Sequence, residues 1–119
     1  MLVRDRTIVS TGYNGAVAKL PHCLDVGCDI VNNHCERVVH AEANAVAQAA
    51  RNGASCAWAT AYITLNPCYN CWKLLVNAGV VRFVYADLYH LDPRVIRGCE
   101  LLHYELVGPT METPRDASV

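Results

Sequence analysis

The sequence has no apolar run near the roughly 18–20 residues that a membrane-spanning helix requires, although 53% of its 119 residues are hydrophobic. It also has no excess of positive charge, because 10 Lys and Arg are balanced by 11 Asp and Glu. A broad basic surface for nucleic acid is therefore not expected. No secretory signal peptide is recognisable, since Met1 leads directly into a strand-like segment. We expect one soluble, cytoplasmic domain with no membrane partner.

Cysteine is the one residue type present in unusual number, at seven. An odd count fits poorly with a closed disulfide framework, and in a reducing compartment such cysteines are metal ligands or buried thiols. A secreted, disulfide-bonded domain is the disfavoured alternative. Cys56 and Cys99 lie outside every motif, and we expect them in the core.

Periodicity and turn residues predict an α/β domain over residues 1–108 and a loose tail at 109–119. The expected strands cover residues 2–4, 7–11, 59–65, 80–86 and 103–107. The expected helices cover residues 39–52, 67–78 and 93–99, with Asn66 as a cap for the second. The strand at 59–65 should be buried on both faces. Strands joined through helices should run parallel, with ligands at their carboxyl ends.

Two short motifs carry the candidate chemistry. His40-Ala41-Glu42 offers an imidazole and a carboxylate, and Pro67-Cys68-Tyr69-Asn70-Cys71 offers two thiols. His40, Cys68 and Cys71 would hold a zinc ion with one tetrahedral position open, as in catalytic zinc sites. Glu42 would then act as the acid or base beside the metal. A purely structural zinc site with three protein ligands is the alternative.

These motifs match the signature of zinc-dependent nucleobase deaminases, and further segments narrow the match. Around them the chain resembles the deoxycytidylate (dCMP) deaminases of the cytidine deaminase superfamily, over about residues 2–107. The resemblance rests on eight segments: Ser10-Thr-Gly-Tyr-Asn-Gly15, Pro21-His-Cys23, Val26-Gly-Cys28, Asn33-His-Cys35, Val39-His-Ala-Glu-Ala-Asn-Ala45, Thr64-Leu-Asn-Pro-Cys-Tyr-Asn-Cys71, Asn77-Ala-Gly79 and Val84-Tyr-Ala86.

This resemblance implies a three-layer fold, with a mixed five-stranded sheet and helices on its faces. The given sequence begins within the first strand, so the helix that usually precedes this strand in the family is expected to be missing. The resemblance also implies hydrolysis of dCMP to dUMP and ammonia, with zinc activating water and Glu42 transferring protons. The residues that it places at the substrate are Asn14, Ala41, Thr64, Pro67 and Tyr89. From the residues alone, Asn14 could equally serve as a turn residue and Tyr89 as a core residue.

The family also suggests further sites. A second zinc would be held by Cys23, Cys28, His34 and Cys35, with His22 in reserve; free buried thiols are the alternative. The resemblance implies a homohexamer regulated by dCTP or dTTP with Mg²⁺, through Gly12, Tyr13, Gly15 and Arg51. Arg51 could instead simply favour the carboxyl end of its helix as a cation.

Three other functions remain open at this point. A transfer RNA adenosine deaminase shares both zinc motifs, but generally lacks the cysteine-rich insert and needs a basic surface. Deamination of free cytosine, cytidine or guanine is a second. A catalytically inactive zinc-binding member of the family is the third.

Overall fold

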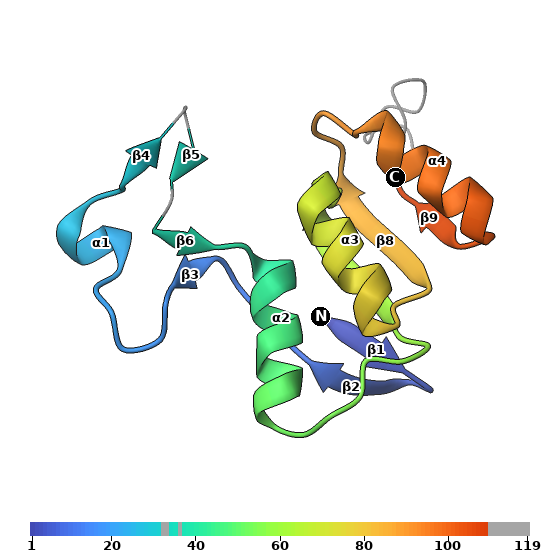
Figure 1. Cartoon of the computed structure of the whole chain (residues 1–119), viewed down its shortest axis with the longest axis horizontal. Coiled ribbons are helices and arrows are strands. Elements are labelled where there is room, and N and C mark those ends of the chain that lie inside the picture. Colours follow the sequence, from blue (N-terminus) through green and yellow to red (C-terminus); the bar gives the residue numbers. More distant parts are fainter. Residues whose placement is uncertain (32–33, 36, 110–119) are drawn as a thin grey trace.

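The computed structural model describes residues 1–31, 34–35 and 37–109, without the side chains of residues 34 and 35. Within these residues, a five-stranded sheet and three helices form the body of the molecule (Figure 1). The strands of this sheet are β1 Leu2–Arg4, β2 Thr7–Ser10, β7 Thr60–Leu65, β8 Arg82–Asp87 and β9 Glu105–Val107. The helices are α2 Ala41–Arg51, α3 Tyr69–Ala78 and α4 Pro93–Leu102.

The sheet is mixed, with the strand order β2-β1-β7-β8-β9. Strand β1 runs antiparallel to both β2 and β7, whereas β7, β8 and β9 are mutually parallel. Helices α3 and α4 connect the parallel strands, as the order of elements predicts. The predicted α/β class and mixed five-stranded sheet are therefore confirmed. The tight turn of the β1–β2 hairpin is also as expected, and both of its residues, Asp5 and Arg6, have positive φ (52° and 61°), the geometry that favours a two-residue hairpin turn.

One core lies between the sheet and the three helices. Alternate strand residues such as Leu2, Ala61 and Phe83 form a single buried cluster with residues of α2, α3 and α4. The small side chains of Ala45 and Ala49, 2% and 1% exposed, form the buried face of α2. Cys56 and Cys99 are buried in the same cluster, which confirms their predicted core positions.

The opposite face of the sheet is more exposed. Tyr62 on β7 is 40% exposed and Ile8 on β2 is 59% exposed, so the prediction that β7 is buried on both faces is wrong. The physical reason is that α2, α3 and α4 all pack against the other face. In the part of the chain that the structure describes, no helix forms a second layer over Tyr62 and Ile8.

None of the described helices has both the length and the apolar character that a membrane-spanning segment requires.

The cysteine-rich insert between β2 and α2 projects away from the sheet (Figure 1). It contains β3 Gly15–Ala16, α1 Cys23–Val26, β4 Ile30–Val31, β5 His34–Cys35 and β6 Val38–Val39. Strand β3 pairs with β6, and β4 pairs with β5, both antiparallel. The first pair returns the chain to the start of α2. The insert thereby fixes how the chain enters the helix that carries His40 and Glu42 at its beginning.

The α3 helix offers a matched test of this packing. Leu75 is fully buried, whereas its neighbour Leu74 is 40% exposed. Leu75→Ala removes buried side-chain atoms and leaves a cavity, which should lower the free energy of unfolding by about 2–5 kcal/mol. Leu74→Ala, the control, should lower it by less than about 1 kcal/mol. Chemical denaturation of both variants would measure the difference, and equal losses would contradict the described orientation of α3.

Candidate active site

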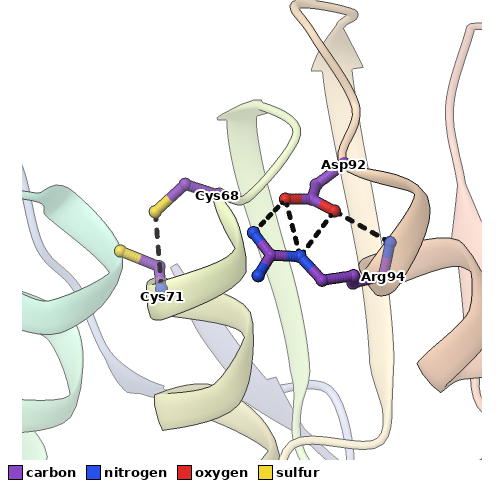
Figure 2. Close-up of polar contacts among 4 residues, drawn as sticks. All are labelled: Cys68, Cys71, Asp92 and Arg94. Carbon is purple, nitrogen blue, oxygen red and sulfur yellow. Dashed lines mark hydrogen bonds and ion pairs between the residues drawn. The ribbon is translucent and has the colours of Figure 1, made fainter.

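The three predicted zinc ligands come together where α2 and α3 begin. His40 is the N-cap residue of α2, and Cys68 is the N-cap residue of α3. The Sγ atoms of Cys68 and Cys71 lie 3.8 Å and 3.4 Å from Nδ1 of His40. Both sulfur atoms point from α3 towards the side on which α2 lies (Figure 2). Among the described residues, this is the one group of three His, Cys, Asp or Glu side chains that could hold a metal, with all ligand atoms within 4.8 Å.

The spacing of these atoms fits a zinc ion. With Zn–S and Zn–N bonds of about 2.3 Å and 2.0–2.1 Å, a tetrahedral site places nitrogen and sulfur about 3.6 Å apart. The two observed nitrogen–sulfur distances lie on either side of this value. The donor set of one imidazole and two thiols also suits zinc, which in catalytic sites takes three protein ligands. The residues present therefore fit the metal that the motifs predict.

The local fold orients the ligands before any metal binds. His40 and Cys68 both have extended backbone angles, as N-cap residues do. The Cys68 sulfur accepts a hydrogen bond from the Cys71 backbone N–H at 3.4 Å (Figure 2). Burial raises the pKa of the Cys71 thiol above its usual range, and the nearby Glu42 carboxylate raises it further. Binding a cation as thiolate would release that proton.

A cavity of about 860 Å³ opens beside these ligands. Glu42 lines it, together with all the predicted substrate-binding residues except Pro67: Asn14, Ala41, Thr64 and Tyr89. Pro67 is fully buried next to Cys68, where it supports the turn into α3. The proposed acid or base and most of the proposed substrate contacts thus share one cavity with His40 and Cys68.

The loop after β2 is fastened to α2 by hydrogen bonds. The Oδ1 atom of Asn14 accepts the backbone N–H of Ala41 at 2.8 Å, and Nδ2 of Asn44 donates to the Tyr13 carbonyl at 2.8 Å. Gly12 lies so close to α2 that a Cβ there would overlap backbone atoms of Ala41 and Ala45. Asn44 was missed by sequence reasoning. Its only signal was a polar side chain one helical turn after His40, which fits many exposed positions.

Asn66 was assigned the wrong role. It was expected to cap α3, but Cys68 is the cap residue, and the Asn66 side chain bonds instead to the backbone of Tyr89. His90, which follows Tyr89 and also lines the cavity, carried no signal in the sequence. Cap and turn propensities are local, whereas the partner of Asn66 lies 23 residues away.

The structure describes only part of the predicted second zinc site and of the predicted effector site. Cys23 begins α1 and Cys28 is exposed, but the side chains of His34 and Cys35 lie outside the description, so the second zinc stays a prediction. Gly12, Tyr13 and Gly15 line another cavity of about 580 Å³ between the insert and α2, as does His22. Arg51 ends α2 and is not among its lining residues. The effector site also stays a prediction.

Comparison with known proteins decides the family. Residues 1–87 match the family model described as the cytidine and deoxycytidylate deaminase zinc-binding region. The chain belongs to this family. It is 39% identical over 92 residues to ComE operon protein 2 of Bacillus subtilis, covering 77% of this chain and 49% of that protein. It is 47% identical over 127 residues to the deoxycytidylate deaminase of Enterobacteria phage T2, covering 75% of this chain and 68% of that protein.

A solved structure supports the same assignment. The dCMP deaminase from the cyanophage S-TIM5, crystallised in complex with dCMP and dUMP, is similar with a TM-score of 0.75 and 25% sequence identity. The match covers 91% of this chain and 77% of that one. The predicted cytidine deaminase-like fold is therefore confirmed. Compared with the Bacillus protein, this chain spans about half of the relative's length.

Two buried cysteines allow a direct test of the metal centre. Cys71 and Cys56 are each 6% exposed, but only Cys71 lies beside His40. Cys71→Ala should lower the zinc content by one ion per chain relative to the unaltered protein, because a thiolate ligand is lost. Cys56→Ala should leave the zinc content unchanged. Metal analysis of the folded, dialysed proteins would measure both, and full zinc retention in Cys71→Ala would contradict the ligand assignment.

Proposed function

We propose that this chain catalyses the hydrolytic deamination of dCMP to dUMP with release of ammonia. The observation that carries the proposal is that the group of His40, Cys68 and Cys71 lies at a nucleotide-sized cavity that Glu42 also lines. The similarity to proteins named as deoxycytidylate deaminases supports dCMP as the substrate. A zinc ion bound at this centre supplies the activation of water near neutral pH.

In this proposal, Glu42 moves the protons. It lies in the first turn of α2, two residues after His40, and its carboxylate interacts with the Cys71 thiol. Glu42 accepts a proton from the attacking water and delivers it to the ring nitrogen next to C4, and it then moves the proton of the new C4 hydroxyl group to the departing exocyclic amine. The exocyclic C4–N bond breaks as the C4–O single bond, formed by the attack of water, becomes the carbonyl double bond. Water and the cytosine base thus become a uracil base and ammonia.

The remaining cavity residues would bind the nucleotide. Asn14 is held at the start of α2 by its bond to the Ala41 N–H, so its amide lies beside the metal centre. Thr64 lies near the carboxyl end of β7, an edge where parallel strands commonly present ligand contacts. Tyr89 is 65% exposed, and an exposed ring at a cavity is available to pack against a base or sugar.

Location and assembly are further parts of the proposal. An odd number of cysteines fits poorly with a closed disulfide framework and suits a reducing compartment, so we place the protein in the cytoplasm. Large apolar side chains are left exposed, including Leu24 at 99% and Trp58 at 77%. Such surfaces are typical of protein–protein contacts and support a homo-oligomer, the state in which nucleotide effectors would act.

Glu42→Gln tests the proposed chemistry. The amide preserves the shape of the side chain but cannot accept the proton, so kcat on dCMP should fall by about 10²–10⁴-fold with the zinc content unchanged. Glu100→Gln, at an exposed position on α4, should keep full activity. Deamination would be followed through the absorbance change of the base, cytosine to uracil with dCMP and deoxycytidine and adenine to hypoxanthine with an adenosine-containing tRNA anticodon stem.

The same assay separates the alternatives. Turnover of dCMP with little turnover of the others supports the proposal, and turnover of the anticodon stem would replace it with tRNA editing. If the zinc-loaded, unaltered protein acts on no substrate, the chain is an inactive member of the family. An active Glu42→Gln variant would remove Glu42 from the mechanism.

A further inference from the structure

Asn66 makes an unusual pair of contacts for a residue next to a metal-binding motif. Its side chain is buried, with the residue 8% exposed. The Nδ2 atom donates to the Tyr89 carbonyl at 2.8 Å, while Oδ1 accepts the Tyr89 backbone N–H. One amide side chain therefore satisfies both backbone polar groups of a single residue 23 positions later. A third contact, from the Asn66 backbone N–H to the Asp87 carbonyl at 3.2 Å, continues the pairing of β7 and β8.

The segment that Asn66 holds is the turn between β8 and α4, which packs against the core farther along at Leu91. Tyr89 is 65% exposed and His90 is also exposed, so core packing cannot determine their positions. His90 has a φ of 42°, a left-handed conformation that a residue with a Cβ rarely adopts unless its surroundings impose it. The two rings pack edge to face, with centroids 4.4 Å apart.

Tyr89 and His90 both line the same cavity as Glu42 and His40. Asn66 thus links two parts of the site. Through Pro67 it continues directly into Cys68, a zinc ligand, and through its side chain it holds the Tyr89–His90 turn. Its side chain takes no part in capping α3, because the Cys68 sulfur already accepts the N–H of Cys71. Burial of an amide in this place therefore has no explanation in the helix start.

We propose that Asn66 is a positioning residue for substrate binding: it holds the Tyr89–His90 turn so that these rings form one wall of the nucleotide cavity. This inference rests on the proposed function, since it concerns the substrate of the same site. Asn66 touches neither the metal centre's ligand atoms nor Glu42 in the described contacts. Its loss should therefore weaken binding much more than the chemical step.

The test compares Asn66→Ala with Asn70→Ala, which removes the same side chain from an exposed position two residues after Cys68. Loss of two backbone hydrogen bonds should raise KM for dCMP about tenfold in Asn66→Ala, with kcat within about threefold and zinc retained. Asn70→Ala should leave both constants unchanged. An unchanged KM in Asn66→Ala would overturn the proposal, as would a loss of activity that follows a loss of zinc.

A double-variant comparison shows whether Asn66 acts through the turn. In a Tyr89→Ala background the ring is already absent, so adding Asn66→Ala should raise KM by clearly less than it does alone. Equal fold-changes in both backgrounds would mean that Asn66 acts elsewhere. If Asn66→Ala does not fold, Asn66→Asp serves instead, because it keeps the shape and the acceptor but sets a carboxylate against the Tyr89 carbonyl. Asn66→Asp should also raise KM, and an unchanged KM would overturn the proposal.

Hydrogen exchange separates this inference from the proposed function, because it needs no substrate. In zinc-loaded protein the Tyr89 amide should exchange at least tenfold faster in Asn66→Ala than in the unaltered chain or in Asn70→Ala. Unchanged exchange would show that Asn66 does not hold the turn. If the unaltered protein fails to deaminate dCMP, the proposed function fails, whereas the exchange rate still decides whether Asn66 positions the turn.

Discussion

The structure depends on the convergence of two helix starts. The amino-terminal ends of α2 and α3 must lie close enough for an imidazole from one and two thiols from the other to reach one ion. Close approach requires small side chains between the elements, and α2 provides them in Ala45 and Ala49. Gly12 adds a further close contact, where the loop after β2 meets the backbone of α2. Larger residues at these points would move the two helix starts apart, and the three ligands could no longer reach one ion.

The helix dipoles at the starts of α2 and α3 also provide a favourable electrostatic environment for anionic side chains. The amino end of a helix carries a partial positive charge, which favours thiolates and carboxylates. Cys68 and Cys71 lie at the start of α3, and Glu42 lies in the first turn of α2. Opposing this, burial and the negative charge of Glu42 raise the pKa of Cys71. A bound cation reverses the balance, because the thiolate gains a partner. The geometry of the three ligand atoms, all within 4.8 Å of one another, is what suits the site to a metal ion.

The body of the fold and the metal ligands could be predicted from the sequence because their signals are local. Alternating hydrophobic residues, glycine at helix ends and each of the two motifs, around His40 and around Cys68, occupy a short stretch of the sequence. Predictions that needed knowledge of distant packing were less successful. An apolar strand at 59–65 does not reveal that helices cover one face only, and Asn66 beside a helix start resembles a cap. Its true partner at Tyr89 is reached only once β7 and β8 are paired.

The segment from Asn66 to Cys71 joins the candidate metal ligands to the opposite wall of the cavity. Pro67 fixes one backbone angle and is fully buried, so the side chains on either side of it are held in a constant relation. Cys68 faces the metal centre, whereas Asn66 faces the turn beyond β8. A displacement of either would be transmitted to the other through one stiff, buried residue. The sequence Asn-Pro-Cys therefore connects the group of His40, Cys68 and Cys71 to the Tyr89–His90 wall of the cavity.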